Sequence, residues 1–251
     1  MNAGRRAKFR GRRLPPAATR NQRFSRRGLF ATIALAAATL GAGLLLGVWR
    51  PAHITPGLAA GSNVLLITID TLRADRVGAY GNRSGLTPTL DQLAARGVRF
   101  EAAYTPVPMT LPAHASILTG LEPPSHGIRN NTAFKLGRTP TLATMLKGAG
   151  YRTGAFVGAL VLSARFGLNR DFDVYDDRIG GDVDPAGARL AERRADEVIQ
   201  PATEWILRAT SRVPANAATT DAPGQNRPWF AWIHLYDPHS PYRAPAEYGH
   251  G

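Results

Sequence analysis

The stretch "NVLLITID", residues 63–70, is an almost unbroken apolar run that ends in a carboxylate. Such a run with β-branched residues is typical of a strand buried on both faces, as in a parallel sheet. Further along the chain, similar runs alternate with segments of helical periodicity. Predicted strands cover 98–104, 151–159 and 229–235, and predicted helices begin near 89, 112 and 139 and extend over 185–211, with a kink expected at Pro201. This alternation predicts an α/β fold, with a mostly parallel sheet flanked by helices.

The net charge of +13 is concentrated at the N-terminus of the 251-residue chain. Residues 1–27 hold ten basic side chains and no acid, whereas the chain after Arg50 carries 20 basic and 18 acidic groups. A basic block beside an apolar segment usually sets membrane orientation, so we interpret the tail as a topology signal and expect no nucleic-acid partner. The absence of cysteine excludes disulfides, thiolate metal sites and thiol nucleophiles.

The segment 28–49 contains 22 uncharged residues. A helix of that length can cross a hydrocarbon core of roughly 30 Å. We expect a cytoplasmic tail at 1–27, a transmembrane anchor or export signal at 28–49, a linker at 50–61 and an α/β domain at 62–251. That domain would be periplasmic or extracellular, held at the inner (cytoplasmic) membrane. "SRRGLF" at 25–30 also resembles a twin-arginine export signal. Only "GLAAG" offers a weak cleavage site, so we favour an uncleaved anchor over a removed signal.

Polar side chains follow several of the predicted strands. Asp70 ends the first strand, Thr110 precedes a helix, and Asp237 and His239 follow the last strand. Ligands of open parallel sheets bind beyond the carboxyl ends of the strands, so these groups should gather along one rim. The local pattern therefore predicts an anion pocket there.

Each of these residues also has an alternative role. Asp70 could bind a divalent cation, cap a helix or pair with Arg73. Thr110 could cap its helix. The free amides of the same helix would suit a phosphate or sulfate, and a metal ion would turn the hydroxyl of Thr110 into a nucleophile. His114, one turn further, could face the same pocket or lie on the surface.

Two loops supply further candidates. The prolines of "DPHSPY", residues 237–242, restrict a loop that carries Asp237, His239 and Tyr242. The loop "PPSHGIRNN", residues 123–131, adds His126 and Arg129, either of which could contact an anion. Both loops could also be turns without a function.

The motifs together are more specific than each alone. "NVLLITIDTLRADRVGAYG", "LPAHASILTG", "HGIRNN", "TLATMLKGAGYRTGAFVG" and "HLYDPHSPY" occur in the order seen in the sulfatase family of the alkaline phosphatase superfamily, which the chain resembles over roughly 61–245. The resemblance implies a divalent metal at the strand ends (Ca, Mn, Mg or Zn) with Asp70 and Thr110 as ligands. It places Thr110 at the nucleophile position, His114 at the position of an arginine, and His239 in contact with the substrate anion.

The chain also departs from that family pattern. Sulfatases convert a cysteine or serine into formylglycine, whereas oxidation of Thr110 would yield a ketone. Thr71 replaces the second aspartate of the usual Asp-Asp pair, and "GALV" at 158–161 replaces a Gly-Lys-Trp-His segment. A threonine followed by x-Pro-x-His resembles instead the phosphodiesterase and phosphatase branches. No downstream Asp-His or Asp-Asn metal motif precedes Gly251, so we expect 62–251 to be incomplete at its C-terminal end.

These features predict a metal-dependent hydrolase of sulfate or phosphate esters, with an anionic ester as its substrate. Two alternatives remain open. One is a phosphoryl or phospholipid-headgroup transferase at the membrane. The other is a catalytically incomplete domain that binds an anion.

Overall fold

The computed structural model describes residues 30, 33, 35, 37–38, 57, 59–179, 192–210 and 227–240. Its centre is a four-stranded sheet in the order β1 (Val64–Ile69), β4 (Trp229–Leu235), β2 (Arg152–Val157) and β3 (Val174–Asp176). All three strand pairs are parallel, which confirms the predicted α/β class. The sheet is parallel, as predicted, but the sequence did not predict the strand β3.

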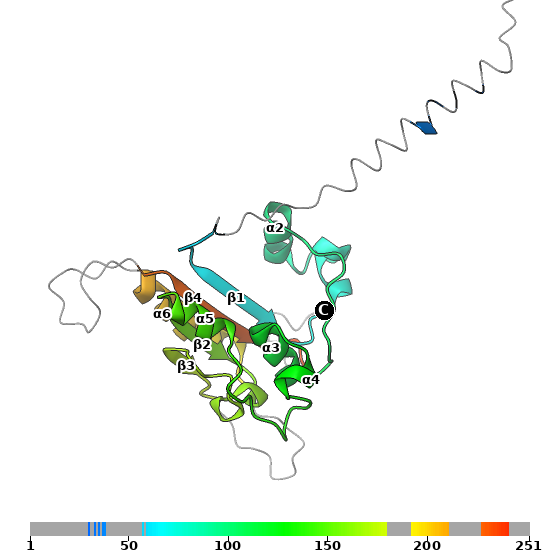
Figure 1. Ribbon diagram of the computed structural model, residues 1–251. Helices are drawn as coiled ribbons and strands as arrows, with labels where there is room; N and C mark the ends of the chain where they lie inside the picture. The colour runs from blue at the N-terminus through cyan, green and yellow to red at the C-terminus, as the bar shows by residue number, and fades with distance from the viewer. Residues whose placement is uncertain are drawn as a thin grey trace, which may run out of the picture. The chain divides into compact units, whose positions relative to one another are not determined.

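Helices cover both faces of this sheet. Alternate residues of β4 point to opposite faces, as the two-residue period of a strand requires. Phe230 and Trp232 share one buried cluster with Leu111 of α3 (Thr110–Thr119) and Ala143 of α5 (Leu142–Gly148). Ile233 belongs to a second cluster, with the helix α6 (Ala195–Thr210). Figure 1 shows α3 beside the arrowhead of β1, at the carboxyl end of the sheet.

Most predicted helices are confirmed, with shifted ends. α2 (Pro88–Arg96) begins with its proline at the first position, as expected. α3 starts two residues before Pro112 and ends at Thr119, followed by Gly120, which adopts the left-handed conformation with φ 69°. α5 begins at Leu142, where Thr141 and Thr144 form a capping box, and not at Pro140. The short helix α4 (Pro123–His126) follows α3.

Two predictions about elements were wrong in part. Residues 98–104 form no strand, and Phe100 and Tyr104 are exposed at 68% and 91%. No described strand lies beside them, so their apolar alternation has no pairing partner. The helix predicted over 185–211 begins only at Ala195, because Glu192 pairs with Ala159 in a bridge and 193–194 are not helical. Residues 180–191 and 211 lie outside the described residues.

Short 3₁₀ turns connect the larger elements. Two follow β1 and two follow β2, and they direct the chain away from the carboxyl end of each strand. They are η1 (Ala74–Arg76), η2 (Gly78–Tyr80), η3 (Leu160–Leu162) and η4 (Ala164–Phe166).

The chain turns sharply where β1 ends. Asp70 still pairs with β4 through its amide, 2.9 Å from the carbonyl oxygen of Leu235. The next residue, Thr71, has φ 54°, which is unfavourable for a β-branched side chain. Such strain persists only where the surroundings hold the backbone in place, and it often marks functional sites. Because the chain turns at Thr71, Asp70 lies at the end of the strand.

The N-terminal predictions lie almost entirely outside the described residues. Within 28–49 the structure describes only positions 30, 33, 35, 37 and 38, which are helical and exposed. Among the described residues, no helix has the length and apolar character needed to span a membrane. The tail at 1–27 falls outside the description. The predicted domain at 62–251 falls within a compact unit formed by Ala59–Gly251.

Candidate active site

The predicted partners Asp70 and Thr110 meet directly. Thr110 is the first residue of α3, and its Oγ1 donates a hydrogen bond to Oδ2 of Asp70 over 3.0 Å. The helix is preceded by Met109 at the N-cap position, which makes no side-chain cap. Thr110 is therefore not the N-cap residue, and the guanidinium of Arg73 forms an ion pair with Asp75. A hydroxyl and a carboxylate from distant segments face each other at the carboxyl end of the sheet.

The carboxylate of Asp70 is nearly buried, with a side-chain exposure of 10%. Burial acts to raise its pKa, but contacts with His234 and the hydroxyl of Thr110 outweigh this effect and lower the pKa below its usual value. Asp70 is therefore an anion at neutral pH. It can attract a cation, but it is a weak base.

His234 lies next to the carboxylate of Asp70 and was missed by the sequence predictions. It is fully buried on β4, with its Nε2 3.4 Å from Oδ2 of Asp70. That distance is long for a hydrogen bond, and neither ring nitrogen has a hydrogen-bond partner among the described residues. A lone imidazole inside the otherwise apolar strand "WFAWIHL" is the signal that could have identified it.

His114 lies beneath Thr110 and uses both ring nitrogens inside the protein. Its Nδ1 donates to the carbonyl oxygen of Thr110 over 2.7 Å, since a carbonyl can only accept. Its Nε2 lies 3.1 Å from Oγ1 of Thr68. The ring also packs edge-on against His234, with centroids 4.8 Å apart. In this arrangement both nitrogens of His114 are engaged within the protein, and a role of His114 in steadying the substrate anion stays a prediction.

Burial lowers the pKa of His114 from 6.5 to about 4. The unfolded chain therefore binds this proton more readily than the native protein, so stability rises with pH. We expect the free energy of unfolding to fall by about 3 kcal/mol as the pH drops from 6.5 to about 4. Urea titrations at closely spaced pH values would measure this slope. His114→Gln should reduce the slope without abolishing it, because burial also lowers the pKa of His126. A slope equal to that of the wild type would contradict this assignment.

The helix offers fewer free amides than its sequence suggests. The amide of Leu111 donates to Oδ1 of Asn131 over 2.9 Å, and that of Ala113 donates to the carbonyl oxygen of Met109. Pro112 has no N–H. Of the first four residues of α3, only Thr110 keeps an amide without a hydrogen bond within the described part of the chain. The predicted anion site on several amides is therefore reduced to one donor.

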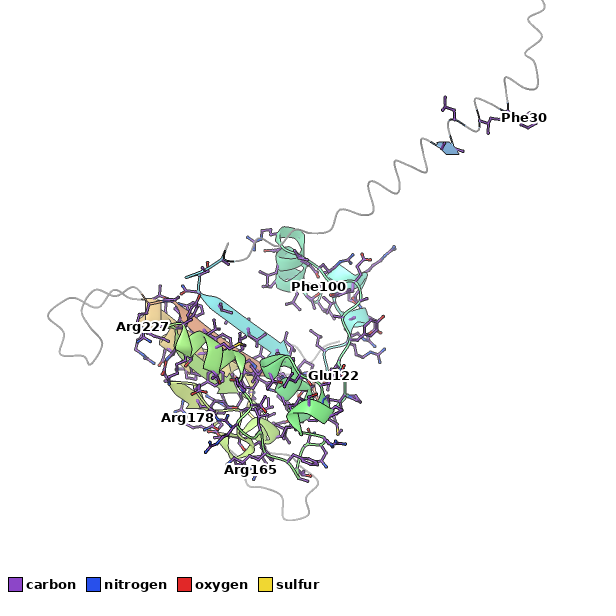
Figure 2. The ribbon with its side chains drawn as sticks, in the orientation of Figure 1. Phe30, Phe100, Glu122, Arg165, Arg178 and Arg227 are labelled. Atoms are coloured by element: carbon purple, nitrogen blue, oxygen red, sulfur yellow. The ribbon has the colours of Figure 1, made fainter. Side chains whose placement is uncertain are left out.

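The loop "PPSHGIRNN" reaches the site through Asn131, a residue that the sequence did not single out. His126 is buried, with Nε2 3.0 Å from Oγ of Ser116 and Nδ1 accepting from the amide of Ile128. Its ring therefore has a structural role. Arg129 is exposed, and no described contact connects it to Asp70 or Thr110. Figure 2 labels Glu122, which immediately precedes α4 at the start of this loop.

The loop after β4 is held by its own contacts. Oδ1 of Asp237 accepts the amide of Ala195 over 3.1 Å and so caps α6. The ring of His239 stacks on Tyr236 at a centroid distance of 4.4 Å, and its Nδ1 donates to the carbonyl oxygen of Ser240. Burial and the charge of Asp70 raise the pKa of Tyr236 to about 12, so this part of the loop lies within the field of the carboxylate. Tyr242 is outside the described residues.

The site fits part of the coordination sphere of a hard cation. Asp70 and Thr110 present two oxygens 3.0 Å apart, and oxygen ligands are those that Mg²⁺, Ca²⁺ and Mn²⁺ prefer. The buried, unpartnered nitrogens of His234 stand beside them. In the described ranges no group of three or more His, Asp or Glu side chains forms a metal cluster. A cation bound here would complete its coordination with other oxygens, as Mg²⁺ does with water and substrate.

The described residues also line a cavity away from this pair. It has a volume of about 430 Å³ and lies between the 132–135 loop and η4. Arg165, which lines it, is labelled in Figure 2. None of its lining residues is a predicted site residue, so it does not change the assignment of Asp70 and Thr110.

Comparison with known proteins identifies the family of the chain. The sulfatase family model matches residues 62–250. Arylsulfatase A of Bos taurus is 41% identical over 109 residues, 40% of this chain and 22% of the bovine protein. An arylsulfatase of Clostridium perfringens is 40% identical over 92 residues, 36% of this chain and 19% of that protein. The chain thus spans about a fifth of the length of these relatives.

A solved structure extends the similarity to the fold. A protein of the alkaline phosphatase superfamily from Vibrio parahaemolyticus superimposes with a TM-score of 0.53 at 22% identity, covering 74% of this chain and 42% of that one. The alkaline phosphatase-like arrangement of a parallel sheet and flanking helices is therefore shared. The match of the family model over three quarters of the sequence leads to one conclusion: the chain belongs to the sulfatase family.

Proposed function

We propose that this protein is a metal-dependent hydrolase of sulfate or phosphate esters, with Thr110 as its nucleophile. The observation that carries the proposal is the 3.0 Å contact between Oγ1 of Thr110 and Oδ2 of Asp70. It joins the start of a helix to the end of a strand 40 residues earlier. The sulfatase family membership and the arylsulfatase relatives support the class of substrate.

The side chains suggest a two-step displacement. Oγ1 of Thr110 attacks the sulfur or phosphorus in line, a new O–S or O–P bond forms, and the ester oxygen leaves with its electron pair. The proton that Thr110 gives up passes to water, and the departing oxygen takes up a proton from water. The proton of the hydroxyl points at Oδ2 of Asp70. Water then hydrolyses the threonine ester, which releases sulfate or phosphate and restores the hydroxyl. Asp70 is a weak base because its pKa is lowered, so it orients this proton more than it removes it.

A divalent cation would supply the missing activation. Bound by Asp70 and Thr110, it would favour the ionised hydroxyl and balance charge on the transferred group. His239 lies on the adjacent loop, where its Nε2 has no hydrogen-bond partner within the described residues, so it is the candidate contact for the substrate anion. Arg129 is a second candidate, because its exposed guanidinium is free to approach a bound ester.

We infer that the protein acts outside the cytoplasm, anchored by 28–49. The uncharged segment and the basic residues before it support this location. A membrane position would also suit transfer to a lipid headgroup, the alternative reaction.

The function is tested on the full chain with three esters: an aryl sulfate, an aryl phosphate and a phosphodiester. Each is assayed with Mg²⁺, Mn²⁺, Ca²⁺ or Zn²⁺, and again with a chelator. We expect metal-dependent release of the aryl alcohol from at least one ester, lost on chelation. Product formation that requires an added lipid alcohol would identify a transferase instead. If no ester turns over while inorganic sulfate or phosphate raises the melting temperature, the domain only binds anions.

A further inference from the structure

Three hydrogen bonds form a directed chain behind Thr110. Nε1 of Trp232 donates to Oγ1 of Thr68 over 3.1 Å, and an indole can only donate. The hydroxyl of Thr68 lies 3.1 Å from Nε2 of His114. Nδ1 of His114 then donates to the carbonyl oxygen of Thr110. The two ends fix the directions: the indole can only donate and the carbonyl oxygen can only accept, so a neutral imidazole carries its proton on Nδ1 and accepts from Thr68 at Nε2.

The parallel pairing of two strands brings this chain together. Thr68 of β1 lies opposite His234 of β4 in the register, and Trp232 is two residues earlier on the same face. That face carries α3, so Thr68 and Trp232 lie beneath the first turn of the helix. Trp232 is fully buried and His114 is 6% exposed. Buried hydrogen bonds are stronger and costly to leave incomplete, so this chain restricts how α3 can rotate on the sheet.

We propose that Thr68 is a positioning residue for Thr110. With Trp232 and His114, it holds the backbone of Thr110 so that the hydroxyl faces Asp70. The inference rests on the proposed function of Thr110 as nucleophile. It also explains why both ring nitrogens of His114 are used within the protein: the imidazole holds the carbonyl group of Thr110 in place. Loss of the Thr68 hydroxyl would leave Trp232 without its acceptor and Nε2 of His114 without its donor.

The test compares two substitutions of one residue. Thr68→Val keeps the shape but removes the hydroxyl, and Thr68→Ser retains it. We expect Thr68→Val to lower kcat by about 10- to 100-fold with KM within twofold, because misplacement of a reacting group acts on the chemical step. Thr68→Ser should recover kcat to within threefold of the wild type.

Thr153→Val is the matched control. Thr153 is fully buried on β2, and its hydroxyl bonds to the carbonyl oxygen of Asp171, away from Thr110. This variant should lose stability but keep kcat. If Thr68→Val keeps the wild-type kcat, or if Thr153→Val loses kcat equally, the positioning role is wrong.

A second readout separates this inference from the proposed function. The methyl and amide resonances of Thr110 are followed by NMR in the full chain. We expect them to shift in Thr68→Val and to stay in place in Thr68→Ser and Thr153→Val. If the wild type turns over no ester, the proposed function fails, and the resonances alone still decide the positioning. Unchanged Thr110 resonances in Thr68→Val would overturn it.

Discussion

Thr110→Ala should lower kcat by about 10⁴-fold, because removal of a nucleophile eliminates the covalent step. Binding of the ester depends on other side chains, so KM should change little. The remaining turnover would come from direct attack by water on an ester that is still held in place. Thr110→Ser, which keeps a hydroxyl on the same carbon, should retain part of the activity. Initial rates with the most reactive of the three esters measure both variants.

Thr119→Ala provides the matched control for this substitution. Thr119 ends the same helix, and its Oγ1 donates to the carbonyl oxygen of Ala115 and not to Asp70. The change removes the same atoms from α3 without touching the proposed site. Circular dichroism should show all three variants folded. Wild-type activity in Thr110→Ala would remove Thr110 from the role of nucleophile.

The contact between Asp70 and Thr110 was predictable because it depends on few assumptions. An apolar run ending in aspartate predicts where a buried strand stops, and a proline-containing turn of small residues predicts a helix start. In a parallel sheet, both positions fall at the same edge. Hence two residues 40 positions apart could be placed together without knowledge of the sheet order.

The side chains beneath that pair could not be found in the same way. Thr68 and Trp232 lie inside strands that the hydrophobic pattern describes as core, where a hydroxyl or an indole carries no separate signal; only the imidazole of His234 differs from its apolar strand. Their meeting depends on the pairing of β1 with β4, which joins segments more than 160 residues apart in register. Asn131 was missed for a related reason: its contact with Leu111 depends on the path of a loop. Hydrophobic period determines which face a residue occupies, but strand order decides its neighbours.

A buried ion pair on the other side of the sheet should matter most for stability. Asp176 ends β3 and is 7% exposed. Arg193, with a side-chain exposure of 6%, approaches both of its oxygens, at 3.0 Å and 3.3 Å. Its Nη2 also donates to the carbonyl oxygen of Glu197. Pro201, four residues later, has no N–H to offer that carbonyl, so Arg193 replaces a missing helical hydrogen bond.

Arg193→Leu should therefore destabilise the protein by about 3–5 kcal/mol, since the carboxylate of Asp176 loses its buried partner and keeps only the exposed Arg178, and a helical carbonyl loses its donor. Arg178→Leu is the control, because Arg178 contacts the same carboxylate over 2.7 Å but is 75% exposed, as its outward position in Figure 2 illustrates. The hydrogen bonds from Arg178 and Arg193 outweigh burial and lower the pKa of Asp176 to about 2, so its carboxylate is charged at neutral pH. Each variant keeps one of the two guanidinium partners. Water can replace an exposed guanidinium, so Arg178→Leu should cost far less than Arg193→Leu. Urea unfolding at pH 7 compares the two, and equal losses would contradict the argument that burial, not contact with Asp176, determines the cost.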